Sequence, residues 1–256
     1  MVVVCGGMPG PELVEPIHPV KYYVYLSRRK VDMFYQQIPG QLLKTISGNL
    51  TVELPLVKIG VGKSAPEPGY YVKLAIVRQF LEKEFGFGTV DDPGAYFRGD
   101  MPLYWGPYRE REDDQSGLVF FGGKTDTTIL GLGGSTDHVI GAKPSSALHS
   151  RSNTPWLIDA LLKDEGHRGR FRKPQSARER NDDRKTALQA VEVAVSSMSS
   201  LRRPAELMEF VAVRLLEGPV TKWWRDVGPD LHRAKRERRK QTKVLLGSPL
   251  YVALVQ

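Results

Sequence analysis

The chain is poor in cysteine and has no long apolar run. Cys5 is the single cysteine among 256 residues, which excludes an intramolecular disulfide and a zinc site built from several thiolates. All apolar runs fall short of the roughly eighteen residues that a membrane-spanning helix needs. The opening apolar run stops at Gly6 with no basic residue before it, so it lacks the pattern of a signal peptide. We therefore expect a cytoplasmic protein without a membrane partner.

A complete catalytic or nucleotide-binding signature is also missing. Gly60–Ser64 ends in Gly-Lys-Ser, but the phosphate-loop pattern requires a glycine where this chain has Val57. Gly131–Ser135 follows an expected strand, as a dinucleotide-binding loop would, but Thr136 stands at the third glycine position. No two histidines have the spacing of metal ligands on one helix. We assign no catalytic residue, metal or cofactor, and we favour a protein that is not an enzyme.

The positive charge of the chain is concentrated in its C-terminal part. Residues 1–150 hold 15 Lys and Arg against 16 Asp and Glu, whereas residues 151–256 hold 22 against 13. Two segments dominate: the first basic run is residues 168–185 and the second basic run is residues 233–243. Such runs can neutralise the phosphates of RNA or DNA, and a solvated linker and helix face are the alternative. The candidate nucleic-acid-binding residues are Arg168, Arg170, Arg172, Lys173, Arg233, Lys235, Arg236, Arg238, Arg239 and Lys240.

The stretch Phe120–Gly141 is rich in glycine and holds one histidine. Its backbone amides could form an anion-binding nest, and a neutral imidazole can act as a base or a phosphate ligand near pH 7. The alternative is a glycine-rich β-hairpin without a ligand. A nearby aromatic cluster could stack on a ligand or fill a core. The candidate ligand-binding residues are Gly133, Gly134, Ser135, His138, Trp105 and Tyr108.

The apolar periodicity predicts an α+β fold. Strands are expected over 20–26, 50–59, 95–108, 117–122, 126–132, 137–142 and 244–255. Helices are expected after Ser27, which can cap the first one, and over 71–85, 155–164, 188–198 and 207–215. The last two helices would form a helical hairpin in the C-terminal half. We therefore predict a mixed, mostly antiparallel sheet with a β-meander, covered by a few helices and completed by a returning C-terminal strand.

The same patterns suggest how the chain is divided. Residues 1–19 contain prolines and glycines without a period, and we expect a flexible extension there. A β-rich α+β region is expected over 20–165 and a basic linker or insertion over 166–183. Residues 184–256 would supply the helical hairpin and the final strand of the same domain.

Four strings of this chain resemble an uncharacterised bacterial and archaeal family of unknown function. They are KYYVYLSRRKVDMFYQQIP at 21–39, GTVDDPGAYFRGDMPLYWGPY at 88–108, the glycine-rich run to Gly141, and VLLGSPLYVAL at 244–254. The family is loosely associated with caspase-and-TPR-repeat-associated (CATRA-like) components of prokaryotic conflict systems. The resemblance implies a cytoplasmic defence or signalling component that acts with protein partners, and it transfers no catalytic residue.

Three hypotheses about function remain open from the sequence. The first is a binding or adaptor protein with protein partners, favoured because every catalytic pattern fails at a required position. The second is a nucleic-acid-binding protein that uses the two basic runs. The third is a small-anion sensor or enzyme centred on Ser135 and His138.

Overall fold

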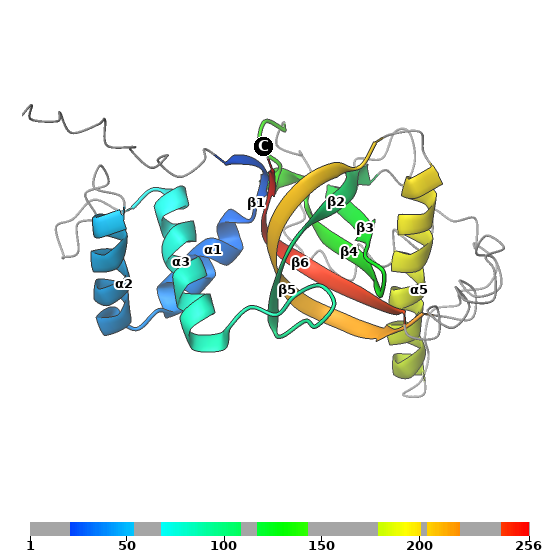
Figure 1. Cartoon of the computed structure of the whole chain (residues 1–256), viewed down its shortest axis with the longest axis horizontal. Helices are drawn as coiled ribbons and strands as arrows, with labels where there is room; N and C mark the ends of the chain where they lie inside the picture. The colour runs from blue at the N-terminus through cyan, green and yellow to red at the C-terminus, as the bar shows by residue number, and fades with distance from the viewer. Residues whose placement is uncertain are drawn as a thin grey trace, which may run out of the picture.

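The protein is built from helices and one mixed sheet, arranged in three layers (Figure 1). A computed structural model describes residues 21–53, 68–108, 117–142, 179–200, 204–220 and 242–255. Three helices lie on one side of the sheet and one long helix lies on the other. The predicted α+β class is confirmed, with antiparallel pairings predominating.

The sheet closes on itself as a small barrel. Its strands are β1 (Tyr22–Leu26), β2 (Tyr96–Tyr108), β3 (Leu118–Lys124), β4 (Thr128–Ser135), β5 (Glu206–Pro219) and β6 (Lys243–Leu254). The strand order is β1-β6-β4-β3-β2-β5, and an additional β5–β6 pairing closes β2 to β6 into a ring, with β1 paired to β6 beside it. β2, β3 and β4 form the predicted meander, and β6 is the predicted returning strand. Because β6 pairs with β1, β4 and β5, it is the strand on which closure depends.

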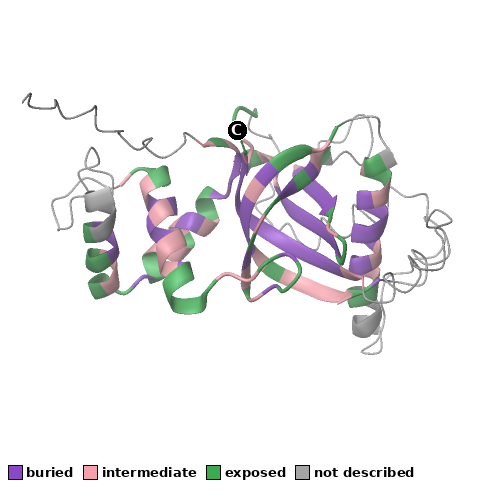
Figure 2. Cartoon of the chain, in the orientation of Figure 1, coloured by how far each residue is buried: buried purple, intermediate pink, exposed green. Residues whose placement is uncertain are grey.

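Side chains alternate between the barrel interior and its outer faces, as strand geometry requires. In β3, Val119 and Phe121 point into the interior cluster, whereas Phe120 packs outward with the long helix. In β6, Leu245 lies inside and Leu246 outside. The strands β3, β4 and β6 are accordingly buried along most of their length in Figure 2, whereas β2 and β5 are mostly half-buried or exposed. The helices therefore cover part of the barrel wall, and parts of β2 and β5 remain at the surface.

Two groups of helices cover the barrel from outside. α1 (Arg28–Gln37), α2 (Gly40–Glu53) and α3 (Tyr70–Phe85) share an apolar cluster with β1, β5 and β6. A buried lysine of α3, Lys73, reaches Asp32 of α1 with an Nζ–Oδ1 distance of 2.8 Å. α5 (Glu179–Ser200) packs on β3, β4 and β6 through Leu188, Val191 and Val195. The helix expected after Ser27 is present, but the Ser27 side chain makes no capping hydrogen bond.

The predicted helical hairpin in the C-terminal half is wrong. Its first helix corresponds to α5, which begins at Glu179, inside the expected linker. Its second helix, expected over 207–215, is instead strand β5. The apolar residues of this segment fit the period of a helix as well as that of a strand. In the structure Met208, Phe210 and Ala212 point into the barrel at the two-residue spacing of a strand. Pairing with β2 on one side and β6 on the other decides in favour of the strand.

Two further predicted strands are corrected by the structure. The strand expected over 50–59 overlaps α2, which continues to Glu53, and residues 54–59 lie outside the described ranges. The strand expected over 137–142 is replaced by a short 3-10 helix, η1 (Thr136–His138). The Ser135 hydroxyl accepts a hydrogen bond from the Asp137 amide, which turns the chain out of β4. The helix expected over 155–164 also lies outside the described residues.

Candidate functional site

The glycine-rich stretch forms the β3–β4 hairpin, but its glycines lie within the strands. Gly122 pairs with Gly131, and Gly133 pairs with Phe120. The turn itself is at Thr125–Thr127, where the Thr125 amide donates to the carbonyl of Thr128. The strands expected over 117–122 and 126–132 correspond to β3 and β4, so the turn between them lies close to its expected place.

These glycines allow large side chains to lie directly against the backbone. A Cβ atom at Gly131 would lie 2.8 Å from Val191 of α5, and one at Gly134 would lie 2.3 Å from the Tyr25 hydroxyl. Contacts this short are not found for real Cβ atoms, so both positions require the absence of a side chain. The glycines of β4 thus bring the helix α5 and the strand β1 close to the barrel wall.

The amides proposed as an anion nest are engaged by the protein. Gly134 pairs with Val119 in the ladder, and the Thr136 amide donates to the Gly117 carbonyl over 2.9 Å. Among the described glycines, positive φ angles occur at Gly86, Gly117 and Gly141. A nest uses residues of alternating handedness, and Gly133 and Gly134 both have ordinary strand conformation. A ligand at these amides remains a prediction without support from their geometry.

His138 lies half-buried against the edge of a tyrosine. Its ring meets Tyr25 with centroids 5.8 Å apart and planes at 88°. Burial, followed by repulsion from the cations of Lys30 and Arg29, lowers the pKa of His138 to about 4, although the Asp137 carboxylate acts in the opposite direction. The imidazole is therefore neutral at pH 7, and it sits beside several cations that the sequence did not connect to it.

This shift predicts a pH dependence of stability. The pKa of His138 in the folded chain, about 4, lies below the ordinary 6.5, so the unfolded chain binds the proton first as the pH falls. The stability contributed by the neutral ring is complete above pH 6.5 and is lost between 6.5 and about 4. The loss amounts to at most about 3 kcal/mol. Urea unfolding of the natural chain and of His138→Gln across this range should show a smaller loss in the variant, and parallel curves would contradict this account.

The two aromatic candidates on β2 have different positions. Trp105 stacks on Phe121 with centroids 5.8 Å apart, and its Nε1 donates to Glu206 over 2.9 Å. The indole thus packs against the interior cluster of the barrel. Tyr108 is the last residue of β2 and pairs with Leu118, and its side chain lies outside the described part of the structure. Packing accounts for the position of Trp105, and a ligand role for either residue remains a prediction.

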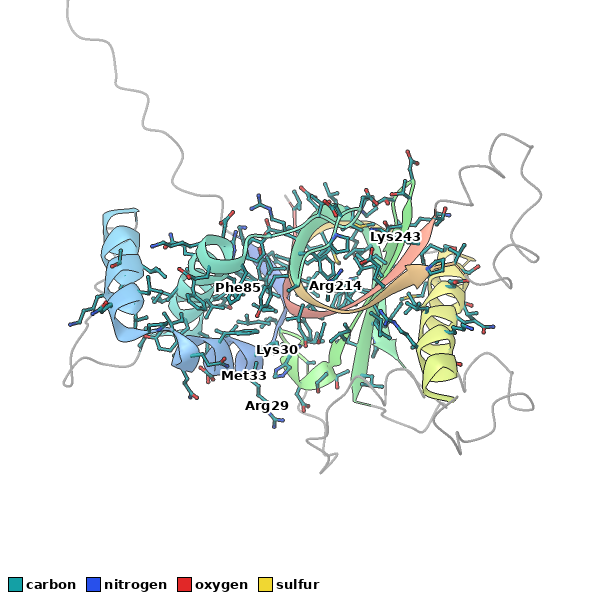
Figure 3. All side chains as sticks on the ribbon, turned by 90° about the horizontal axis from the view of Figure 1, so that it is seen from below. Arg29, Lys30, Met33, Phe85, Arg214 and Lys243 are labelled. Carbon is teal, nitrogen blue, oxygen red and sulfur yellow. The ribbon has the colours of Figure 1, made fainter. Side chains whose placement is uncertain are left out.

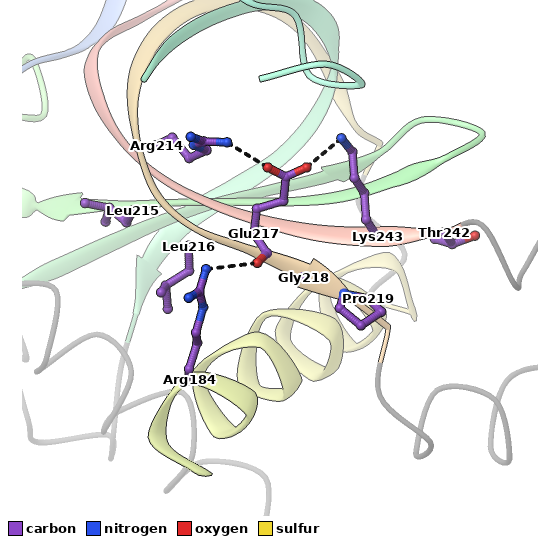
Figure 4. Close-up of a pocket in the computed structure, with 9 residues that line it drawn as sticks. All are labelled: Arg184, Arg214, Leu215, Leu216, Glu217, Gly218, Pro219, Thr242 and Lys243. Carbon is purple, nitrogen blue, oxygen red and sulfur yellow. Dashed lines mark hydrogen bonds and ion pairs between the residues drawn. The ribbon is translucent and has the colours of Figure 1, made fainter. Parts of the chain in front are cut away.

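The ten candidate nucleic-acid-binding residues lie outside the described ranges, but the described ends of both basic runs meet at one pocket. Arg184 belongs to the first basic run and Lys243 to the second. With Arg214 of β5 they line a pocket of about 630 Å³ where α5, β5 and β6 come together (Figure 4). Leu215, Leu216, Glu217, Gly218, Pro219 and Thr242 complete its lining. Segments widely separated in sequence thus converge on one end of the barrel. We call it the basic pocket.

One carboxylate organises the cations of the basic pocket. Glu217 accepts from the Lys243 ammonium at 2.7 Å through one oxygen and from the Arg214 guanidinium at 2.9 Å through the other. Arg184 donates to the backbone carbonyl of Glu217 over 3.4 Å. Burial acts to raise the pKa of Glu217, but the hydrogen bonds from Lys243 and Arg214 hold it below its ordinary value. Three cations face one carboxylate, so the lining carries a net positive charge.

A second carboxylate beside the basic pocket is held by hydroxyl groups. The Asp91 Oδ1 atom accepts from Thr125, Thr127 and Thr128 at 2.5, 2.7 and 2.8 Å. Burial acts to raise the pKa of Asp91, but these hydroxyls hold it below its ordinary value, and the Lys243 cation adds to their effect. This cluster fixes the β3–β4 turn next to β6. Asp91, Arg214 and Glu217 were not among the residues predicted from the sequence as candidate site residues. They come together only in the closed barrel.

Comparison with known proteins identifies the family of this chain. Residues 21–256 match a family described as a family of unknown function, DUF7019. The chain belongs to that family. No curated protein and no solved structure matches the DUF7019 chain. The match agrees with the predicted resemblance to an uncharacterised family, and it shows no link to conflict systems.

Two further observations concern ions and membranes. Within the described residues of this DUF7019 protein, no group of three or more His, Cys, Asp or Glu side chains could hold a metal ion. The helices of the described ranges are too short or too polar to cross a membrane.

Proposed function

We propose that this DUF7019 protein binds nucleic acid through its phosphates at the basic pocket. The observation that carries the proposal is the convergence of both basic runs on this pocket, through Arg184 and Lys243 (Figure 4). A polyanion that enters the pocket would meet a described residue of each run, Arg184 of the first and Lys243 of the second. The first run holds eight cations against three acids, and the second holds seven against one. Neutralising phosphates releases counterions, which supplies most of the affinity in such complexes.

The arrangement within the basic pocket suits a phosphate backbone. A guanidinium presents several N–H donors to phosphate oxygens, whereas an ammonium acts as a compact charge. Glu217 holds Arg214 and Lys243 in place, so these cations are oriented before a ligand arrives. Arg184 is exposed and donates to the backbone carbonyl of Glu217. None of these groups reads a base edge, and we therefore propose binding without sequence preference.

A protein-binding role is the second candidate, favoured by exposed aromatic side chains on α3 and β1. Tyr71 and Phe85 of α3 are 58% and 60% exposed, and Tyr22 of β1 is 60% exposed. Exposed large apolar side chains can take part in protein interfaces. If the chain binds neither RNA nor DNA, this candidate takes the place of the first.

Neutralising the basic pocket tests the proposed function. We expect Arg184→Gln combined with Lys243→Gln to weaken binding of a fluorescein-labelled RNA about tenfold in low salt, because two phosphate contacts are lost. The slope of log affinity against log salt should also become shallower by between one and two. Fluorescence anisotropy measures both quantities.

The matched control removes the same charge elsewhere on the barrel. Arg98→Gln combined with Lys124→Gln changes two exposed cations on β2 and β3, and neither residue lines the basic pocket. Circular dichroism should show that both double variants remain folded. Equal affinities for the two double variants would argue against a specific role of the pocket.

A further inference from the structure

A second group of cations lies at the opposite end of strand β4 from the basic pocket. Thr128, the first residue of β4, pairs with Lys243 of the pocket, whereas Ser135, the last, leads directly into η1 and His138. At that end Val139 bridges Tyr25, and the Ile140 amide donates to the Val24 carbonyl over 2.9 Å, so η1 lies beside the end of β1 that leads into α1. Three consecutive basic residues occupy the first turn of α1, namely Arg28, Arg29 and Lys30, and all three act on His138. Figure 3 shows Arg29 and Lys30 near the beginning of α1.

Two cations of this cluster, Lys30 and Arg28, contact neutral groups. Lys30 Nζ donates to the Pro249 carbonyl over 3.2 Å, and burial lowers the pKa of Lys30 to about 8. The Arg28 guanidinium lies 5.1 Å from the centre of the Tyr70 ring of α3. The first turn of α1 contains no acidic residue, and the positive end of the helix dipole adds to the local charge. Asp137 is the one carboxylate that acts on His138, so cations outnumber acids here.

A buried hydroxyl lies at the junction of the two elements that carry this cluster. Tyr25 is fully buried, and its ring contacts that of His138. Its hydroxyl lies close to the side chain of Ser27, the residue that precedes α1, and to the backbone of Ser135, but neither contact reaches hydrogen-bonding geometry. Buried hydroxyls in folded proteins are almost always satisfied. This unsatisfied group therefore lies at the junction of the same two elements, β1–α1 and β4–η1.

We propose that His138, Arg28, Arg29 and Lys30 form a binding site for the phosphate group of a small molecule. A phosphate dianion offers several acceptor oxygens to two guanidinium groups and an ammonium. The neutral imidazole of His138 can donate a hydrogen bond to the same group through one ring nitrogen. The helix N-terminus favours the negative charge. The site is independent of nucleic-acid binding, since it shares no residue with the basic pocket.

The imidazole of His138 provides a direct measurement of this proposal. Long-range ¹H–¹⁵N spectra of the histidine rings would be recorded while inorganic phosphate is added at constant ionic strength and neutral pH. We expect saturable shifts of the His138 signals, and a pKa for His138 that rises by about one unit or more, because a bound dianion offsets the cations that depress it. The other four histidines, His18, His149, His167 and His232, serve as internal references. Adenosine monophosphate in place of phosphate shows whether an organic group adds to the affinity.

Variants distinguish a site from general ionic effects. Arg28→Gln combined with Arg29→Gln changes two exposed side chains and should abolish the saturable shift, whereas the Arg98→Gln and Lys124→Gln control should keep it. Lys30→Met provides a second variant that keeps the length of the half-buried side chain and should weaken phosphate binding at least several-fold. The proposal is overturned if chloride gives the same shift, if all five histidines respond alike, or if the Arg28 and Arg29 variant responds like the natural chain.

Discussion

Neutralising the second basic run is expected to lower the affinity for RNA at least about 100-fold in low salt. The replaced residues would be Arg233, Lys235, Arg236, Arg238, Arg239 and Lys240, each changed to glutamine. The expected effect is large because each phosphate contact that is lost no longer releases a counterion from the nucleic acid. Each such loss lowers the binding constant by a factor, and these factors multiply. Fluorescence anisotropy with labelled RNA and DNA of equal length measures the loss.

A charge-preserving variant is the control for this prediction. In it the four arginines of the same set become lysines and the two lysines become arginines, so the net charge is unchanged. We expect this variant to bind within a few-fold of the natural chain, because phosphate contacts of this kind depend on charge more than on side-chain shape. If the glutamine variant bound RNA as tightly as the charge-preserving one, the second basic run would have no part in binding.

Replacing Gly134 with alanine is expected to destabilise the barrel by about 3 kcal/mol. The added Cβ would lie 2.3 Å from the Tyr25 hydroxyl and 2.6 Å from the ring carbon that carries it. Tyr25 is fully buried against Phe121 and His138, so the ring cannot move aside without disturbing the interior. The free energy of unfolding in urea gives the loss directly.

Gly106 of β2 is the matched control for Gly134. Both are strand glycines without a positive φ angle, but a Cβ at Gly106 would meet nothing within 4 Å. Gly106→Ala should therefore leave stability unchanged or raise it by about 0.5 kcal/mol, because alanine restricts the unfolded chain. An equal effect of the two substitutions would show that the glycines of β4 are not required by close packing.

The meander and the final strand were predicted because each of their strands can be recognised from its own residues. Glycine and proline separate alternating apolar runs at β2, β3 and β4, and residues 244–255 are too apolar to remain exposed. The closure of the barrel was not predictable in this way. It depends on pairings between β5, β6 and β4, which join distant segments and have no signature in any one of them. The error at 207–215 has the same origin, since that apolar set fits a helix until its partners are known.

The candidate site was predicted in part. The two basic runs are evident in the sequence, but the pocket that joins them also needs Glu217 and Arg214, and Arg214 was expected on a helix. His138 was selected for its chemistry, yet its cationic neighbours lie more than a hundred positions earlier, at Arg28–Lys30. Gly133 and Gly134 were predicted as ligand positions, and the close contact with Tyr25 explains the glycine at 134. The sequence predicted residues whose role follows from their own side chain, such as His138. It did not predict residues whose role depends on tertiary contacts, such as Glu217.

The salt dependence of nucleic-acid binding tests the central claim most directly. The natural chain would be titrated with a labelled RNA and a labelled DNA by anisotropy, at salt concentrations from about 50 to 200 mM. With about six phosphates neutralised, the account predicts a slope near −4 in a plot of log affinity against log salt, and hence a loss of a few hundred-fold over that range. Absent binding, or an affinity that does not change with salt, would contradict it.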